Sequence, residues 1–170
     1  MLTDELTAYI KTLDLKRERW ETNLDYSLFL FVLFQIVMIS LNWNSLPDTI
    51  PTHFNFRGEA DGYGGKGILL LFPILSIAIY FLMSIAYKWP QFINIPWSLT
   101  KENIIRQIRL VWRMLLYLKI AVMLIFSYLT YQMIQIALHN EQFLGHFFIV
   151  IVIFKLGVII WYFRKSYLLK

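Results

Sequence analysis

The sequence predicts an all-α integral membrane protein with four transmembrane helices. Two further amphipathic surface helices are expected, one at the N-terminus and one before the third span. Hydrophobic residues make up 58% of the 170 residues, whereas soluble domains hold roughly 45–50%. These residues are concentrated in four long runs, and a transmembrane helix needs roughly 20 mostly apolar residues. The fold class therefore follows from composition and from the length of the runs.

Charge and cysteine content narrow the chemistry. The formal net charge is +5, but the basic residues cluster at the ends of the apolar runs, which argues against nucleic acid as a partner and for the lipid bilayer. The chain has no cysteine, so it has neither disulfides nor thiolate metal ligands.

Residues 1–24 are predicted to form a cytoplasmic amphipathic helix on the membrane surface. Apolar side chains recur near helical spacing in this segment, with acids at its start and bases near its end, as the helix dipole favours. The alternative is a solvated helix that packs on the protein's own loops. Residues 25–170 are expected to form a single four-span membrane domain.

The four spans are expected at residues 26–43, 68–87, 115–138 and 147–163. Gln35 is the one strongly polar residue inside the first span. Pro73 is expected to kink the second span, which membranes tolerate when neighbours satisfy the freed carbonyl. Residues 88–100 contain tryptophans and prolines and are expected to form an interfacial turn.

An amphipathic stretch at residues 100–114 leads into the third span. Ile104, Ile108 and Val111 form its apolar stripe, and three arginines line another face: Arg106, Arg109 and Arg113. This surface is predicted to bind anionic lipid or a cytoplasmic protein partner.

Residues 44–67 form the longest stretch that is neither continuously apolar nor simply basic. Five of the seven glycines lie between Gly58 and Gly67, and Pro47 and Pro51 precede them. Proline biases the chain towards extended conformations and glycine permits tight turns. The stretch is therefore predicted to be a specified loop, extended at first and tightly turned later, with its glycines as turn formers.

The distribution of basic residues predicts the topology. Twelve Lys or Arg residues lie in the N-terminal segment, the second connection and the tail, against Arg57 and Lys66 in the loop 44–67. Because Lys/Arg-rich flanks stay in the cytoplasm, both termini are expected inside the cell. The loop 44–67 and the connection 139–146 are expected outside.

The loop carries a motif between the first two spans. The residues of the motif are, in order, Pro51, His53, Gly58, Asp61, Gly62 and Lys66. Over about residues 25–87 the chain resembles a bacterial domain of unknown function found at the start of SdpI-like immunity proteins. Those are multi-pass membrane proteins that protect the producing cell from the secreted SDP cannibalism toxin. The resemblance implies a bacterial cell membrane and an immunity role.

The residues expected to recognise a ligand or partner are those of the motif together with Glu59. His53 is a candidate for a partner contact, for metal binding or proton transfer, or for a hydrogen bond that only holds the turn. Lys66 is expected to extend to the headgroups, with an ion pair to Asp61 or Glu59 as the alternative.

Lys155 is the unusual residue of the fourth span. It lies nine residues from His146 and from Arg164, about 14 Å from each along a helix, where a charged lysine costs about 2.5–3.5 kcal/mol. It is expected to face the bundle interior with Gln35 as its partner. Its role is expected to be structural packing, a subunit contact or transport.

The leading hypothesis is a membrane protein whose extracytoplasmic loop recognises an extracellular peptide, toxin or envelope component, for immunity or signalling. One alternative is a small transporter or channel component that uses Lys155 as a homo-oligomer. Another is an outer-face metal hydrolase built on His53, His139 and His146, although no recognised ligand spacing or catalytic motif is present. No cofactor or catalytic residue is expected.

Overall fold

The computed structural model describes residues 4–55, 57–90, 93, 95–139, 145 and 147–170. Its helices are α1 (Asp4–Thr12), α2 (Arg19–Ser27), α3 (Phe29–Asn42), α4 (Leu71–Lys88), α5 (Ile104–His139) and α6 (Phe147–Leu168). Strands β1 (Thr49–Phe54) and β2 (Ala60–Gly65) lie between α3 and α4, and a short 3₁₀-helix, η1 (Lys66–Leu70), leads into α4.

Four helical segments are long and apolar enough to cross a membrane. They are Arg19–Asn42, Lys66–Lys88, Ile104–His139 and Phe147–Leu168. The predicted class of a four-span helical membrane protein is confirmed, and the loop between the first two spans adds a small two-stranded sheet to it.

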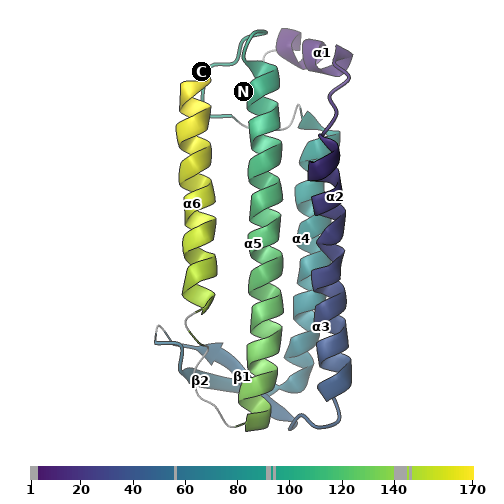
Figure 1. The fold of residues 1–170 in the computed structure, drawn as a ribbon, viewed down its shortest axis with the longest axis vertical. Coiled ribbons are helices and arrows are strands. Elements are labelled where there is room, and N and C mark those ends of the chain that lie inside the picture. The colour runs from purple at the N-terminus through teal and green to yellow at the C-terminus, as the bar shows by residue number, and fades with distance from the viewer. Residues whose placement is uncertain (1–3, 56, 91–92, 94, 140–144, 146) are drawn as a thin grey trace.

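Helix α5 is the central element of the bundle. It packs against α3 and α4 on one side and against α6 on the other. Figure 1 shows α1 and the C-terminal end of α6 at one end of the bundle and the two strands at the opposite end. The four spans thus separate a hairpin end from an end that holds both termini.

The first span begins earlier than the sequence predicted. Helix α2 starts at Arg19 and continues, through one turn at Leu28, into α3. The backbone amide of Glu18 donates a hydrogen bond to the Glu21 carboxylate at 3.1 Å, an arrangement that fixes a helix start. The N-terminal helix accordingly ends at Thr12, and α2 crosses the boundary that was placed between residues 24 and 25.

The apolar stripe expected on a surface helix before the third span is instead buried within the protein. Ile104, Ile108 and Trp112 belong to α5 itself and pack with Ile10 of α1. The predicted amphipathic helix is thus the first part of a continuous α5. Its apolar face packs against α1.

Candidate functional site

The loop 44–67 folds into an antiparallel hairpin, in which β1 pairs with β2. Asn55 organises the turn: its side-chain oxygen accepts hydrogen bonds from the backbone amides of Arg57 (2.8 Å) and Glu59 (3.1 Å), and its amide donates to the Glu59 carboxylate at 2.8 Å. Gly58 has φ +79°, a left-handed conformation that costs other residues about 1–2 kcal/mol. Glu59 and Gly58 therefore serve the turn.

Gly62 and Gly64 are strand residues, which corrects their prediction as turn formers. A Cβ at Gly62 would lie 2.9 Å from the Cβ of His53, its partner across the sheet, and one at Gly64 would lie 3.1 Å from Cγ2 of Thr52. A side chain at Gly62 would therefore clash with β1, and one at Gly64 would fit only if Thr52 shifted by a few tenths of an ångström.

His53 and Asp61 form an exposed polar pair near the turn. The His53 Nδ1 lies 2.5 Å from a carboxylate oxygen of Asp61, and the two side chains are 73% and 43% exposed. Pro51 differs from them, because it is buried in β1. Among the predicted recognition residues, His53 and Asp61 thus form one exposed pair. Pro51 lies in the buried part of the hairpin.

Lys66 anchors the hairpin to the bundle. Its ammonium group donates hydrogen bonds to the backbone oxygens of Trp43 (3.3 Å) and Leu46 (3.1 Å) and lies 3.4 Å from the exposed carboxylate of Asp48. The two carbonyls follow the end of α3, where a cation is favoured by the helix dipole. The pairing of Lys66 with Asp61 or Glu59 is not formed; the lysine ties the loop to α3 instead.

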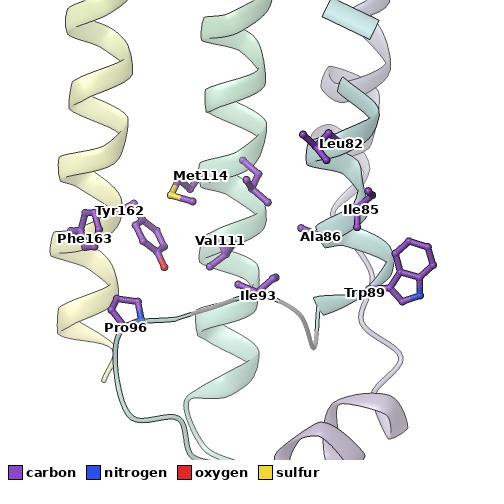
Figure 2. Close-up of a pocket in the computed structure, with 11 residues that line it drawn as sticks. Leu82, Ile85, Ala86, Trp89, Ile93, Pro96, Val111, Met114, Tyr162 and Phe163 are labelled. Atoms are coloured by element: carbon purple, nitrogen blue, oxygen red, sulfur yellow. The ribbon is translucent and has the colours of Figure 1, made fainter. Parts of the chain in front are cut away.

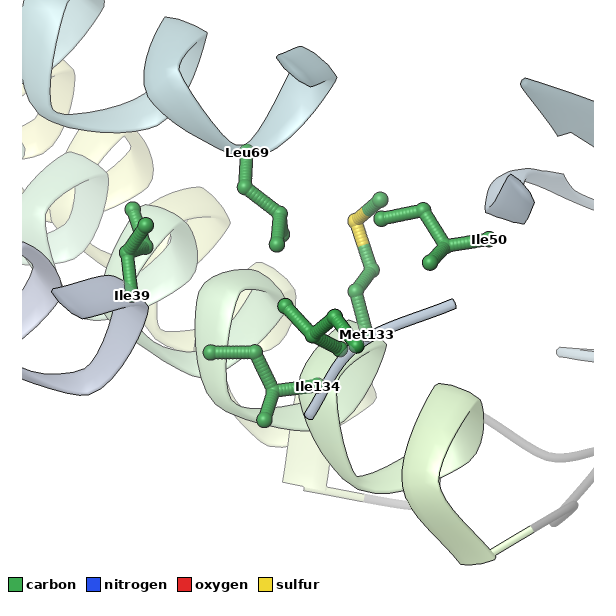
Figure 3. Packing of buried hydrophobic residues seen from close by; sticks show 6 residues of the cluster. Ile39, Ile50, Leu69, Met133 and Ile134 are labelled. Atoms are coloured by element: carbon green, nitrogen blue, oxygen red, sulfur yellow. The ribbon is translucent and has the colours of Figure 1, made fainter. Parts of the chain in front are cut away.

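The base of the hairpin is part of the core. Ile50 of β1 and Leu69 of η1 are fully buried and pack with Ile39 of α3 and with Met133 and Ile134 of α5 (Figure 3). The hairpin is therefore fixed at its base by apolar contacts to three helical elements.

A partly buried charge network lies towards the other end of the bundle, and the sequence analysis did not find it. We define this charge network as Arg17, Glu18, Glu21, Asp25, Arg113 and Lys119. The Lys119 ammonium is fully buried and donates hydrogen bonds to Asp25 (2.9 Å) and to the hydroxyl of Ser84 (2.7 Å). It also lies 4.3 Å from the ring centre of Tyr80 and 4.5 Å from that of Tyr87. Lys119 therefore joins α2, α4 and α5.

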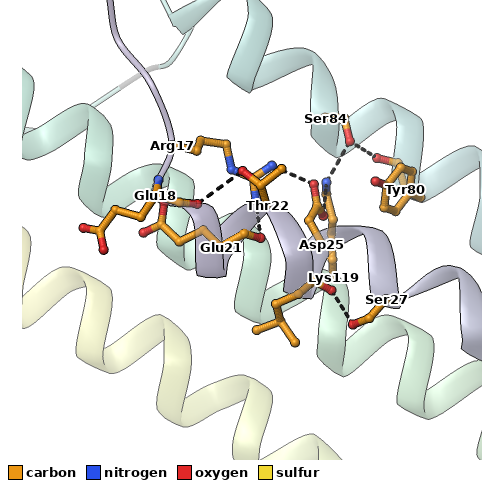
Figure 4. Close-up of polar contacts among 10 residues, drawn as sticks. Arg17, Glu18, Glu21, Thr22, Asp25, Ser27, Tyr80, Ser84 and Lys119 are labelled. Carbon is orange, nitrogen blue, oxygen red and sulfur yellow. Dashed lines mark hydrogen bonds and ion pairs between the residues drawn. The ribbon is translucent and has the colours of Figure 1, made fainter.

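The network continues along α2, as Figure 4 shows in part. Arg17 pairs with the second oxygen of Asp25 at 2.7 Å. Arg113 pairs at 2.6 Å with both Glu18 and Glu21. Three cations thus meet three carboxylates, so the network is formally neutral.

Arg113 is therefore not part of a free basic surface. Arg106 and Arg109 are exposed, and Arg106 donates a hydrogen bond to the backbone carbonyl of Glu102 at 3.4 Å. The predicted three-arginine lipid surface reduces to Arg106 and Arg109, because Arg113 turns towards the carboxylates of α2.

Gln35 lies at the centre of a second buried polar cluster. Its side-chain amide donates to the hydroxyls of Ser76 and Ser127, each at 3.1 Å, and Ser76 donates back to its carbonyl at 3.2 Å. The predicted Gln35–Lys155 pair is not formed, because the side-chain amide of Gln35 is hydrogen-bonded to Ser76 of α4 and Ser127 of α5.

Lys155 lies on α6, in line with the buried residues Ile151, Val158 and Tyr162, and its side chain is half-buried. Among the residues that the structure describes, it forms neither an ion pair nor a hydrogen bond. The prediction that it turns towards the bundle agrees with this position, but the expected contact with Gln35 is not formed.

An apolar pocket of about 670 Å³ opens between α4, α5 and α6 near the end that holds the termini. Figure 2 shows side chains of α6 at one edge, side chains of α4 at the other, and Val111 and Met114 of α5 between them. Its lining is almost entirely hydrocarbon, so it suits an apolar group and not a polar substrate.

The histidines do not form a metal centre in the described residues. His139 lies in the last turn of α5 and is exposed, and His146 lies outside the described residues. Within the described part of the chain, no group of three His, Asp or Glu side chains is arranged to hold a metal ion.

Residues 30–77 match the profile of a protein family described as a domain of unknown function, DUF1648. The chain is also similar to an uncharacterized protein of Archaeoglobus fulgidus, with 39% identity over 64 residues. That match covers 33% of this chain and 35% of the archaeal protein, so it spans about a third of the relative. No solved structure matches the chain.

The matched segment runs from α3 through the hairpin and η1 into α4. It contains His53, Asp61 and Lys66 but none of the charge network. The protein is thus a multi-pass membrane protein in which residues 30–77 match the DUF1648 domain.

Proposed function

We propose that the hairpin recognises an extracellular peptide, toxin or envelope component at the outer face of a bacterial cell membrane, in an immunity or signalling role. The observation that carries the proposal is the exposed His53–Asp61 pair on a hairpin whose base is buried in the bundle. A rigid support with an exposed polar tip favours recognition, because little ordering is lost when a ligand binds.

The sheet offers a way to hold a peptide. In the described structure it has two strands, and β1 also contacts α5. Among the described residues β2 pairs with no strand besides β1, and its outer edge therefore suits binding by strand addition, in which an extended peptide pairs with the backbone and side chains select it. Tyr63 in β2 is 64% exposed and is available for such a contact.

The charge distribution supports the orientation. Arg106 and Arg109 belong to the first turns of α5, and the basic tail from Arg164 to Lys170 follows the last turns of α6; Figure 1 shows the start of α5 and the end of α6 at the end of the bundle opposite the hairpin. Positively charged flanks remain cytoplasmic, so the hairpin end faces outwards and both termini face the cytoplasm. The resemblance to SdpI-like immunity proteins favours a secreted toxin as the ligand.

The proposal is tested in a toxin-sensitive bacterial host that produces the chain and is challenged with secreted membrane-active peptides. The wild-type chain raises the tolerated dose of at least one peptide, and the double variant His53→Ala/Asp61→Ala loses that protection. Charge-assisted hydrogen bonds contribute about 1.5–3 kcal/mol, so the variant binds the peptide about ten- to a hundredfold more weakly.

The matched control is Glu5→Ala/Lys101→Ala, which removes another exposed ion pair at the opposite end of the bundle. It keeps full protection. Equal protection by the wild type and the hairpin variant, at equal amounts in the membrane, would show that the His53–Asp61 pair is not the recognition surface.

A further inference from the structure

Lys155 is a charged residue in the middle of a membrane span, and no ion pair or hydrogen bond joins it to another described residue. It lies eight residues from Phe147 and eight from Phe163, about 12 Å from either in a helix. No other charged residue lies between these two positions. Its depth therefore places it near the centre of the bilayer, far from both headgroup layers.

Lys119 shows how this protein stabilises a buried ammonium group. Lys119 has a carboxylate, a hydroxyl and two aromatic rings around it. Lys155 has no ion pair or hydrogen bond with any residue that the structure describes. Since intramembrane lysines pair with polar groups or line an aqueous cavity, Lys155 still calls for a partner beyond the residues that the structure describes.

A second copy of the chain cannot supply a free carboxylate at this depth. Of its eleven acidic residues, only Glu21 and Asp25 lie within the four membrane-crossing helices. Both already pair with cations of the charge network. A carboxylate at the depth of Lys155 is therefore more readily supplied by a different protein than by a second copy of this chain.

The side of α6 that such a partner would contact is also defined. Lys155 precedes Tyr162 by seven residues, so both lie on one face of α6, about 10 Å apart, and Tyr162 lines the apolar pocket between α4 and α6.

We propose that Lys155 is the intramembrane contact for a transmembrane helix of another protein, which carries an aspartate or glutamate near its midpoint. The helix packs along α6, beside the apolar pocket, and its carboxylate pairs with the Lys155 ammonium. This proposal is independent of ligand recognition by the hairpin.

The test uses two designed single-span peptides rich in leucine and alanine, one with a central glutamate and one with a central glutamine. Each is reconstituted with the full chain in phosphatidylcholine vesicles, and association is measured by energy transfer. The glutamate peptide associates with the wild type about tenfold more strongly than with Lys155→Leu, the scale of an interhelical polar contact in a bilayer. The glutamine peptide shows a much smaller difference. Lys165→Leu, at the end of α6, is the matched control and behaves as the wild type.

Equal association of both peptides with the wild type and with Lys155→Leu would overturn the proposal. A second measurement covers the isolated chain: without any peptide, Lys155→Leu melts in detergent at the same or a higher temperature than the wild type. Melting at a clearly lower temperature would mean that Lys155 already has a partner within the chain, and would equally overturn the proposal.

Discussion

Asp25 is the residue on which the charge network depends most. Its two oxygens serve two different cations, Arg17 at 2.7 Å and Lys119 at 2.9 Å. Removing one partner of a buried ion pair costs about 3–5 kcal/mol, because the other charge stays buried without compensation. Loss of the shared carboxylate is therefore more damaging than loss of either cation.

We predict that Asp25→Asn lowers the free energy of unfolding by about 3–5 kcal/mol. Lys119→Met costs less, about 1–3 kcal/mol, because Asp25 keeps Arg17 as its partner. Unfolding in mixed micelles, followed by circular dichroism, measures both. The opposite order, with Lys119→Met the more damaging variant, would contradict the shared role of Asp25.

At the scale of elements, the hairpin depends on glycines whose neighbours leave no room. We predict that Gly62→Ala destabilises the hairpin, because the new methyl group meets Cβ of His53 at 2.9 Å. Overpacking of this kind costs about 1–3 kcal/mol. Hydrogen exchange of the β1 and β2 amides measures the effect.

Gly67→Ala is the matched control, since a Cβ there meets no atom within 4 Å. We expect this variant to leave the protection of the β1 and β2 amides against hydrogen exchange unchanged or to increase it, because alanine restricts the unfolded chain. Equal exchange rates in the two variants would show that the close approach of β1 to β2 does not select glycine.

Helix α1 is held by apolar contacts more than by its ion pair. Ile10 is 3% exposed and packs with Ile104, Ile108 and Trp112, whereas Glu5 and Lys101 are exposed. Lys101 holds the pKa of Glu5 below its ordinary value of 4.5. A lowered carboxyl pKa contributes stability above the ordinary value, and that contribution is lost as the pH falls through the lowered pKa.

We therefore predict that acidification through the pKa of Glu5 leaves α1 docked, because exposed pairs contribute little and the apolar contacts do not titrate. Ile10→Ala releases α1 at neutral pH. Limited proteolysis within residues 4–18 measures both. Release of α1 on mild acidification, with Ile10→Ala without effect, would assign the docking to the ion pair.

At the scale of the whole molecule, the sequence was enough to predict the spans and the loop, because these depend on which residue types follow one another along the chain. Four apolar runs predicted four spans, and prolines followed by glycines predicted an extended segment with a tight turn. The partners of individual side chains were not predictable. Asp25 and Lys119 are 94 positions apart, and their contact depends on the rotation and order of α2, α4 and α5, which hydropathy does not encode.

Gln35 illustrates the same difficulty. Depth in the membrane suggested Lys155 as its partner, yet the serines that bind it, Ser76 and Ser127, lie 41 and 92 positions away. A small hydroxyl residue in an apolar run carries little signal, because serine often bonds its own helix. The sequence does hold one signal for the contact between Asp25 and Lys119, because both residues lie near the same end of their spans.

The orientation of the bundle is tested most directly by thiol labelling. The chain has no cysteine, so Arg57→Cys in the hairpin turn and Arg109→Cys in α5 each introduce one exposed thiol. A membrane-impermeant maleimide added to intact cells is expected to label position 57 and spare position 109, with both labelled after permeabilisation. Labelling of position 109 in intact cells, with position 57 protected, would contradict the assignment of the hairpin to the outside.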